Sequence, residues 1–492
     1  MSIVTRFAPS PTGYLHIGSL RTVLFNYLYT KQQDGKFMLR IEDTDRTRLV
    51  EGSAENLQEV LASVWLIPDE GPNNPWERGP YFQSERLEIY QTCIKKLLES
   101  GHAYYCFCSS ERLEELRSEQ QELGLPTKYD KKCRYLTPEE VQANLDAWLP
   151  YTIRLAVPEA REISFTDTIR WNISVPSKDV DDQVLIKTDG FPTYHFAVVV
   201  DDYLMWVTDI IRGDEWIPST PKHVLLYEAF GWEMPKYSHV PPLIWNDKKK
   251  LSKRTGDVSV EVFLEKWYIP EALINYIALL GWNPKTTEEI FSLSELISRF
   301  RLEDVQRAWA VFDIERLDWF NSRYIMSLSI DSLEWKLKKY LKRYNPQFLN
   351  TLSQFPEEYN RNILTELQTR LKRFSEYQEL TNFFYNEKEY FDTDIFLNPK
   401  MKITNLWEVK ESLEFAYEVL NNNSYNFSTY QDIKEVFIEK IQASGKKNGQ
   451  ILWPIRVALS WEKFSPWAFE LISIFWKEKS IEKIQKSLKL IT

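Results

Sequence analysis

Residues 3–29 read IVTRFAPSPTGYLHIGSLRTVLFNYLY, and the elements that they encode set the fold class. Ile3 to Phe7 has the apolar, β-branched character of a short strand. Ala8 to Gly13 is rich in proline and other turn residues, and the leucines from Leu20 to Tyr29 recur at helical spacing. The segment therefore predicts a strand, a loop and a helix, in that order.

The elements that follow repeat this alternation. Lys36 to Ile41 is a short apolar run, and Glu85 to Glu99 has the spacing of an amphipathic helix. Further strands are expected at Leu204 to Ile211 and at His239 to Trp245. Strands that alternate with helices favour a parallel sheet with right-handed crossovers. We therefore predict an α/β Rossmann-like parallel-sheet domain.

Two regions depart from this alternation. Residues 96–200 contain closely spaced cysteines and proline-punctuated strands, which predicts an α+β insertion, and mostly helical spacing follows residue 257. The predicted divisions are 1–95 and 201–256 for the two halves of the sheet domain, 96–200 for the insertion, 257–330 for a helical domain and 331–492 for an all-α C-terminal region.

The composition is that of a folded protein with several domains, since 492 residues exceed the usual size of one core. The net charge of −10 argues against indiscriminate binding of nucleic acid, which depends on many Lys and Arg. The charge is uneven, at about +2 for residues 331–492 and about −12 for residues 1–330. A local basic surface is therefore compatible with the composition.

We expect no membrane span, because no apolar run approaches roughly 18–20 residues. We also expect no leader peptide, because the strand-like Ile3 to Phe7 follows the initiator almost at once. Three of the four cysteines, Cys106, Cys108 and Cys133, lie within a short stretch. This spacing suits a metal cluster in a reducing compartment better than a disulfide framework, with ordinary free thiols as the alternative. We expect a cytoplasmic protein.

Two short motifs have the chemistry of a nucleotide site. His16-Ile17-Gly18-Ser19 stands where the first loop enters the first helix, and a glycine, a histidine and a helix N-terminus suit a purine and its phosphates. Lys250-Leu251-Ser252-Lys253-Arg254 follows a predicted strand, and lysines on such a loop stabilise charge on a transferring phosphate. Taken singly, a helix cap and a solvated basic loop are sufficient explanations.

Together, the two motifs resemble the HIGH and KMSKS motifs of class I aminoacyl-tRNA synthetases, with Ser19 in place of the final His and KLSKR as the second motif. Three further stretches resemble the glutamyl and glutaminyl branch: Arg40-Ile41-Glu42-Asp43-Thr44-Asp45, Asp189-Gly190-Phe191-Pro192-Thr193-Tyr194-His195 and Ile211-Arg212-Gly213-Asp214-Glu215-Trp216. Gly449 to Arg456 looks like the bacterial anticodon-binding domain, so the resemblance covers almost the whole chain.

The resemblance to bacterial-type glutamyl-tRNA synthetases implies a monomer that activates glutamate with ATP and Mg²⁺ and transfers it to tRNA(Glu), or also to tRNA(Gln). It implies acceptor-stem binding by 96–200, stem contact by 257–330 and anticodon binding by 331–492. The alternatives are a glutaminyl-tRNA synthetase, a small nucleotidyltransferase and a catalytically silent RNA-binding paralogue. The helical spacing after residue 331 opposes the glutaminyl enzyme, and the length of chain beyond the lysine loop opposes the nucleotidyltransferase. The silent paralogue is opposed by the intact His16, Lys250 and Lys253.

A glutamate site needs cations for two carboxylates and an anion for one ammonium, because buried charges must be paired. Within the matched motifs, the expected roles are carboxylate binding by Arg6 and Arg212, ammonium binding by Glu42, and neutral hydrogen bonds from Ser10 and Tyr194. Some relatives place an Asn four residues after the position of Tyr194, where this chain has Val198.

The resemblance also implies a nucleotide site and a set of catalytic residues. ATP binding is expected from His16, Gly18, Glu215, Trp216 and Lys253, and catalysis from His16, Lys250 and Lys253. Asp201 and Asp202, which follow the apolar Ala197 to Val200, are expected near the tRNA acceptor end or, alternatively, in a strand-ending acidic turn.

The cysteines resemble the zinc site of some of these synthetases. A structural zinc site needs four ligands, and the sequence offers only Cys106, Cys108 and Cys133. Relatives use a His or a Tyr as the fourth ligand. In this chain Tyr129 or Tyr135 is expected to take that place.

Overall fold

The computed structural model describes residues 2–45, 47–245, 259–386, 392–425, 427 and 429–491. The chain divides into two compact units. Unit 1 contains Met1–Leu264 and Pro270–Ile314, and unit 2 contains Glu265–Ile269 and Glu315–Thr492. Lys250 and Lys253 of the predicted lysine loop lie outside the described residues.

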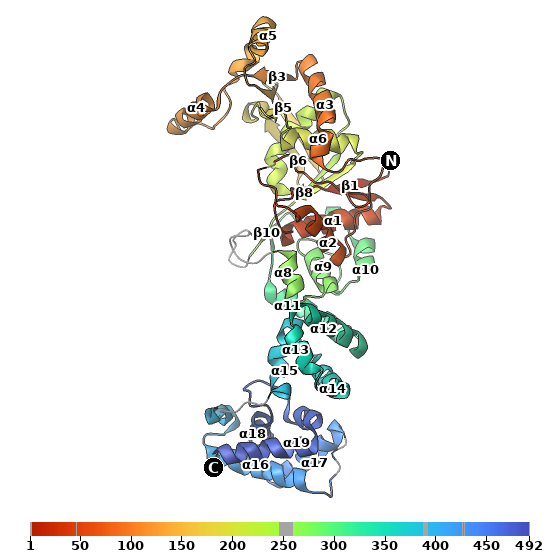
Figure 1. The fold of residues 1–492 in the computed structure, drawn as a ribbon, viewed down its shortest axis with the longest axis vertical. Helices are drawn as coiled ribbons and strands as arrows, with labels where there is room; N and C mark the ends of the chain where they lie inside the picture. The colour runs from red at the N-terminus through yellow and green to blue at the C-terminus, as the bar shows by residue number, and fades with distance from the viewer. Residues whose placement is uncertain are drawn as a thin grey trace. The chain divides into compact units, whose positions relative to one another are not determined.

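Parallel strands form the centre of unit 1 (Figure 1). β1 (Val4–Phe7), α1 (Ile17–Gln32) and β2 (Lys36–Leu39) follow the predicted order, with Val4 opposite Lys36 in a parallel pair. β8 (Asp209–Gly213) and β9 (Lys236–Val240) are also parallel, and the Thr208 N–H donates to the Val4 carbonyl oxygen over 3.0 Å. This bond joins β8 to β1. The predicted α/β Rossmann-like class is confirmed.

The segment between the two halves of the sheet forms the predicted α+β insertion. α3 (Leu87–Glu99) leads into it, and it contains α4 (Ser110–Glu122), α5 (Pro138–Asp146) and the antiparallel strands β3 (Ala103–Cys106), β4 (Thr152–Leu155) and β7 (Val184–Ile186). The hairpin of β5 (Glu162–Asp167) and β6 (Trp171–Pro176) comes from the same segment but joins the central sheet, because Asp167 pairs in parallel with Tyr237 of β9. The insertion therefore contributes Asp167 to the central sheet.

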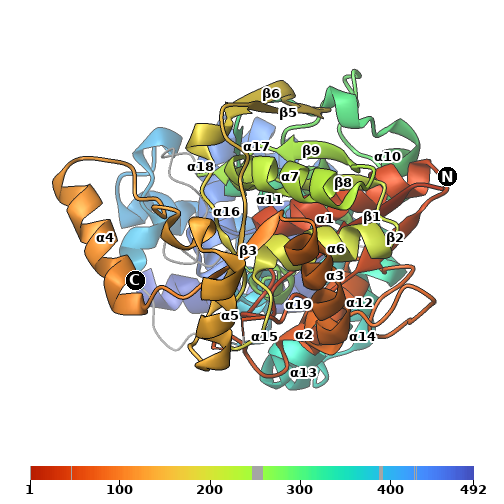
Figure 2. The same cartoon turned by 90° about the horizontal axis from the view of Figure 1, so that it is seen from above.

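α6 (Tyr194–Leu204) packs beside α3, as Figures 1 and 2 both show. The interpretation of Asp201 and Asp202 as a strand-ending turn is wrong, because both residues lie inside this helix. The run from Ala197 to Val200 is buried at every position, and such a run has no periodicity that distinguishes a helix from a strand. The strand expected from Leu204 therefore begins later, at Asp209.

The other elements of unit 1 surround this sheet. They are α2 (Ser53–Ser63), α7 (Thr220–Phe230), α8 (Val260–Glu265), α9 (Pro270–Ala278) and α10 (Leu293–Arg299), with the parallel pair β10 (Leu243–Ile244) and β11 (Ala310–Val311). Short 3-10 helices are η1 (Gln83–Arg86), η2 (Lys132–Tyr135), η3 (Ser177–Asp179), η4 (Asp214–Ser219) and η5 (Leu302–Asp304).

In its described residues, unit 2 consists of α-helices, 3-10 helices and loops. The helices are α11 (Ile314–Ser327), α12 (Ile330–Tyr344), α13 (Pro346–Leu352), α14 (Glu357–Leu367), α15 (Tyr377–Tyr385), α16 (Leu406–Asn421), α17 (Tyr430–Ala443), α18 (Asn448–Ser460) and α19 (Ala468–Ile491), with η6 (Phe374–Glu376), η7 (Thr393–Phe396) and η8 (Pro399–Met401). The predicted all-α C-terminal region is therefore confirmed. Among the described residues of the whole chain, no helix combines the length and apolarity that a bilayer span requires.

Tryptophan occupies an unusual set of backbone positions. Twelve described residues other than glycine have a positive φ, and seven of these are Trp65, Trp148, Trp171, Trp206, Trp267, Trp461 and Trp476. An L-residue in the left-handed region costs roughly 1–2 kcal/mol, a cost that glycine avoids. Seven such residues cost about 7–14 kcal/mol together, which is comparable with the whole stability of a domain, about 5–15 kcal/mol.

Candidate active site

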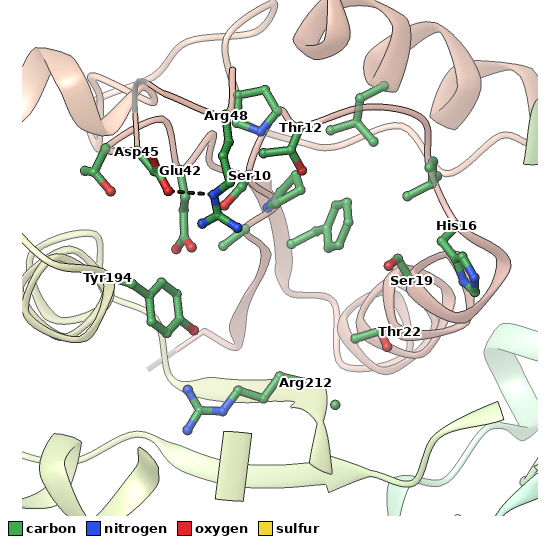
Figure 3. A pocket seen from close by; sticks show the side chains of 18 of the residues that line it. Ser10, Thr12, His16, Ser19, Thr22, Glu42, Asp45, Arg48, Tyr194 and Arg212 are labelled. Carbon is green, nitrogen blue, oxygen red and sulfur yellow. Dashed lines mark hydrogen bonds and ion pairs between the residues drawn. The ribbon is translucent and has the colours of Figure 1, made fainter. Parts of the chain in front are cut away.

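A cavity of about 700 Å³ opens in unit 1, where the carboxyl ends of β1 and β8 meet the N-terminus of α1. Figure 3 shows Glu42, Tyr194 and Arg212 extending toward the same space from separate segments. Ligands of open α/β sheets bind at this end of the strands. The predicted site residues that line the cavity are Arg6, Ser10, His16, Glu42, Tyr194, Arg212, Glu215 and Trp216.

Glu42 is the buried carboxylate of the cavity. Its side chain is almost inaccessible, and the Arg40 Nη2 donates to its Oε1 over 3.2 Å. Burial raises the pKa of Glu42 to about 7, while the guanidinium groups of Arg40 and Arg6 limit the rise. The carboxyl group therefore changes its charge near neutral pH.

Arg6 of β1 is already paired inside the protein. Its Nε donates to Asp202 Oδ1 over 3.1 Å, and both side chains are buried. Burial lowers the pKa of Arg6, but the charge and hydrogen bond of Asp202, together with Tyr194, raise it above its usual value. Arg40 also forms an ion pair with Asp202, at 2.8 Å. Asp202 is therefore shared by two buried arginines.

The neighbouring Asp201 is fully enclosed. Its carboxylate accepts hydrogen bonds from Arg86 Nε at 2.7 Å, Gln83 Nε2 at 2.8 Å and the Tyr90 hydroxyl at 2.8 Å. Asp201 and Asp202 thus face arginine, glutamine and tyrosine side chains of unit 1 and not solvent.

Arg212 of β8 has neutral partners. Its Nε donates to His239 Nε2 over 3.0 Å, its Nη2 donates to Thr220 Oγ1 over 2.9 Å, and His223 Nδ1 lies 3.4 Å from both Nη atoms. In the described part of the chain, no carboxylate lies within ion-pair distance of this guanidinium. Among the described residues, the positive charge of Arg212 therefore has no ion-pair partner.

An aromatic pair and a glycine turn lie next to Arg212. The rings of Tyr194 and Trp216 are 4.3 Å apart at an interplanar angle of 35°. Burial raises the pKa of Tyr194 to about 12, so its hydroxyl stays protonated at neutral pH. A Cβ at Gly213 would lie 2.3 Å from a Glu215 carboxylate oxygen, so a larger residue there would displace the end of the Glu215 side chain. A flat ring beside exposed backbone suits a nucleotide base.

His16 is the N-cap of α1. Its Nδ1 accepts the Gly18 N–H over 3.0 Å, which leaves the proton of the neutral ring on Nε2. A backbone bridge joins His16 to Ser259, and the Val260 N–H donates to the Leu15 carbonyl oxygen over 2.9 Å. Ser259 is the first described residue after the predicted lysine loop. The chain that follows this loop therefore returns to the His16 turn.

The cavity also has cationic side chains that the sequence reasoning missed. Arg48 forms an ion pair with Asp45 at 2.6 Å and extends toward Ser10 in Figure 3. Lys187 donates to the Thr44 carbonyl oxygen over 3.2 Å. Both residues lie in irregular segments, where no periodicity marks the direction of a side chain. Their nearness to two of the quoted motifs was the available signal.

The three cysteines form a compact cluster in the insertion. The Sγ atoms of Cys106, Cys108 and Cys133 all lie within 4.8 Å of one another. The Tyr129 hydroxyl is 3.4 Å from the Sγ atoms of both Cys106 and Cys108, whereas the Tyr135 hydroxyl donates to Glu159 and its side chain is exposed. The donor set of three thiols and one phenol oxygen has the number and proximity that a tetrahedral zinc site needs, with Tyr129 as the fourth group.

Comparisons with known proteins agree with this geometry. A family profile described as "tRNA synthetases class I (E and Q), catalytic domain" matches residues 2–319, and one described as "Anticodon binding domain" matches residues 335–488. The chain is 45% identical to the glutamate–tRNA ligase of Clostridium tetani over 98% of this chain and 96% of that protein. It is 44% identical to the ligase of Clostridium botulinum over 99% of each.

Solved structures show the same likeness. The glutamate–tRNA ligase of Elizabethkingia meningosepticum, crystallised with its amino acid, has a TM-score of 0.86 and 34% identity over the full length of both chains. The enzyme of Elizabethkingia anophelis has a TM-score of 0.87 and covers 99% of this chain. With matching profiles for both regions and near-complete coverage at 45% identity, the chain belongs to the glutamate–tRNA ligases of the class I aminoacyl-tRNA synthetase family.

Proposed function

We propose that this chain ligates glutamate to tRNA(Glu) in two steps at the cavity of unit 1. The observation that carries the proposal is the pair Arg212 and Glu42, an uncompensated guanidinium and a buried carboxylate that line one cavity. A free amino acid with an extra carboxylate supplies the opposite charges. Glutamine lacks the second negative charge and would leave Arg212 unpaired, at a large cost for a buried group.

The other lining residues have supporting roles in glutamate binding. Ser10 and the Tyr194 hydroxyl offer neutral hydrogen bonds, and the protonation of Tyr194 suits it to donate to a carboxylate. Arg6 adds positive potential behind Glu42, although its Nε is held by Asp202. Val198 is buried in α6 and offers no hydrogen bond there.

ATP binds across the His16 turn and the Trp216 platform. His16 and the N-terminus of α1, which includes Gly18, approach the phosphates, and Glu215 and Trp216 of the cavity border the nucleoside. Lys250 and Lys253 contribute positive charge at the α-phosphate, and the return of Ser259 to His16 supports their nearness to it. Mg²⁺ accompanies ATP as the counter-ion of its phosphates.

In the first step the α-carboxylate oxygen of glutamate attacks the α-phosphorus of ATP. The bond between the α-phosphorus and its bridging oxygen breaks, so glutamyl-adenylate forms and pyrophosphate leaves with the electron pair. In the second step a hydroxyl of the terminal adenosine of tRNA attacks the glutamyl carbonyl, and AMP leaves. The protein residues position the reactants and offset charge, and none of them forms a covalent bond.

The tRNA is held by the regions outside the sheet domain. Residues 96–200 bind the acceptor stem, residues 257–330 contact the stem, and residues 331–492 bind the anticodon, in keeping with the anticodon-binding profile at 335–488. The enzyme acts as a cytoplasmic monomer. Cys106, Cys108, Cys133 and Tyr129 would hold a structural zinc ion, which would stabilise the fold of the insertion.

Glutamate-dependent exchange of pyrophosphate into ATP tests the reaction, measured with tRNA(Glu), with tRNA(Gln) and without tRNA. We expect exchange with glutamate and tRNA(Glu), and the tRNA(Gln) arm determines whether the enzyme discriminates between the two. Exchange driven by glutamine alone would contradict the substrate. The absence of any exchange would favour a silent paralogue.

Elemental analysis of the purified protein tests the zinc site. We expect one equivalent of zinc, lost in Cys133→Ser and retained in Cys93→Ser, since Cys93 lies apart from the cluster in α3. A metal-free protein with full activity would contradict the zinc proposal and leave the reaction intact.

A further inference from the structure

Three of the five histidines of the chain form a continuous hydrogen-bonded array around Arg212. His239 Nδ1 lies 2.6 Å from Asp167 Oδ2, and its Nε2 accepts from Arg212. On the other side of Arg212, His223 Nδ1 faces the guanidinium and His223 Nε2 lies 3.1 Å from His195 Nδ1. The array joins five elements, in the order β5, β9, β8, α7 and α6.

The hydrogen bonds of Arg212 determine where the protons of this array lie. A guanidinium has donors and no acceptor, so the ring nitrogens that face it, His239 Nε2 and His223 Nδ1, carry no proton. The proton of His239 is therefore on Nδ1, where it is donated to Asp167. The proton of His223 is on Nε2, where it is donated to His195, and both rings are neutral.

Burial supports neutral rings. His223 and His239 are 1% and 0% exposed, and burial lowers the pKa of both, with Arg212 acting in the same direction. Asp167 opposes the shift at His239, and Glu215 does so more weakly. Protonation of either ring would place a like charge against the guanidinium, which the low-dielectric interior penalises.

We propose that His223 and His239 are positioning residues that fix the orientation of Arg212 through neutral acceptors and so keep its charge available to the glutamate carboxylate. The proposal rests on the proposed function of the cavity. A carboxylate in either place would hold Arg212 equally well but neutralise it, as Asp202 does for Arg6. Asp167 orients His239 from the insertion, so the inserted segment contributes to the geometry of the amino-acid site.

The test compares steady-state kinetics of two variants at the same residue. His223→Leu removes the acceptor at similar volume, whereas His223→Asn places an amide oxygen near the position of Nδ1. We expect His223→Leu to raise the KM for glutamate by about 10- to 100-fold with the KM for ATP unchanged, because hydrogen bonds to charged groups have that magnitude. His223→Asn should remain within a few-fold of the wild type.

A separate readout keeps the proposal testable if a variant fails to fold. Nitrogen NMR of the intact enzyme labelled at histidine should show His239 protonated on Nδ1 and His223 on Nε2. The reverse tautomers, or an unchanged glutamate KM in His223→Leu, would overturn the positioning role. If Arg212→Gln also leaves the glutamate KM unchanged, the proposed function itself fails, which separates the two outcomes.

A second inference rests on the backbone at the ends of helices. Among the described residues of unit 1, the helices α1, α3, α4 and α7 end in the same pattern. A residue with positive φ and the residue after it both donate backbone hydrogen bonds to the last turn of the helix. In α3, Gly101 N–H donates to Leu98 and His102 N–H to Leu97, and α4 repeats the pattern at Gly124. This is the Schellman motif, whose left-handed position is usually glycine.

Three further helices have the identical pattern with tryptophan in the glycine position. Trp65 at the end of α2 donates to Ala62 and its successor to Leu61, and the same two bonds recur at Trp148 after α5 and at Trp206 after α6. Those three side chains are 40%, 92% and 57% exposed. Burial of the indole therefore returns little of the cost of the strained backbone.

The residues that occupy the positive-φ position at these helix ends do not form a continuous range of sizes. Among these ends the position holds glycine, the smallest residue, or tryptophan, the largest, while α1 has Asp34, a short side chain that tolerates positive φ. A Cβ at Gly101 or Gly124 would meet nothing within 4 Å, so space does not distinguish the glycine sites. Trp476 has φ 64° and ψ 169°, a region that is essentially restricted to glycine.

We infer that these positions are glycine in the protein as its natural source makes it. The cell would then decode as glycine a codon that is translated as tryptophan in the printed sequence. The inference covers the tryptophans with positive φ, which are Trp65, Trp148, Trp171, Trp206, Trp267, Trp461 and Trp476. Tryptophans with ordinary backbone and built surroundings are true tryptophans. Trp232, which stacks on Tyr203 with ring centroids 4.0 Å apart, is one of them.

Peptide mass spectrometry of the enzyme from its natural source tests this inference. We expect glycine at residues 65, 148 and 206 and tryptophan at Trp232 in the same sample. Tryptophan at the three helix ends would overturn the inference.

A recombinant pair gives an independent measurement. The triple variant W65G, W148G and W206G should melt about 5–10 °C above the chain with tryptophan, and Gly101→Trp should lower the melting temperature. Equal melting temperatures in all three proteins would remove the physical basis of the inference.

Discussion

The cavity of unit 1 contains two buried arginines that are held in opposite ways. Arg6 is tied to the Asp202 carboxylate, whereas Arg212 is held by two imidazoles and a hydroxyl. A buried guanidinium that is paired with a carboxylate is neutralised and contributes to stability. A buried guanidinium that is held by neutral acceptors is fixed in orientation, but its positive charge can still bind a ligand. The comparison teaches that the partners of a buried cation, more than its location, indicate whether it serves stability or binding.

Removal of the shared carboxylate should have the largest effect on stability. Asp202→Asn leaves Arg6 and Arg40 buried with less compensation, so we expect a loss of about 3–5 kcal/mol in the free energy of unfolding, measured with denaturant. Arg212→Gln is the matched control and should cost much less, since it strands no carboxylate. Equal losses in the two variants would contradict the distinction between the two arginines.

Substitution of Arg212 should have a large effect on catalysis and a small effect on stability. Arg212→Gln is expected to lower kcat/KM for glutamate about 100-fold, because the ligand carboxylate loses its buried ionic partner. The KM for ATP should change little. An increase in the use of glutamine by this variant would sharpen the assignment, and unchanged kcat/KM for glutamate would refute it.

The carboxylate of the cavity should give the site a pH dependence. Glu42 must be ionised to bind an ammonium, and its pKa is raised to about 7 by burial. We therefore expect kcat/KM for glutamate to fall about fivefold between pH 7 and pH 6, with no such fall in a Glu42→Gln variant.

The contribution of Glu42 to the free energy of unfolding depends on pH in the opposite direction from its contribution to kcat/KM. Its folded pKa lies above the usual value of 4.5, so the folded state binds more protons between about pH 4.5 and pH 7. Stability from this group is therefore complete below that window and is lost as the pH rises through about 7. Denaturation at pH 5 and pH 8 should show a smaller difference in Glu42→Gln than in the wild type.

The smallest effect is expected on the surface of unit 2. Arg361 pairs with Asp331 at 2.6 Å, but Asp331 is largely exposed and solvent screens the pair. Asp331→Asn should change the melting temperature by less than about 1 °C. If Asp331→Asn lowered stability as much as Asp202→Asn does, burial would not explain the difference between the exposed ion pair of Asp331 and the buried ion pair of Asp202.

Sequence patterns predicted the elements with clear periodicity and failed where periodicity was absent. β1, α1 and β2 appeared in the expected order, because the apolar run and the leucine spacing are local signals. Asp201 and Asp202 were misplaced, since the fully apolar run before them fits a helix and a strand equally well. The lysine loop falls outside the described residues, so the roles of Lys250 and Lys253 stay predictions.

The sequence by itself determined the fold class, the family and eight of the residues that line the cavity. Only the tertiary structure decided which arginine is neutralised, because Asp202 contacts Arg6 from a helix 196 residues away, and His223 and His239 contact Arg212 from two other elements. It also places the Tyr129 hydroxyl beside the cysteines and the Tyr135 hydroxyl on Glu159. Motifs record which groups are present, whereas their charge and availability depend on contacts that form only when distant segments pack together.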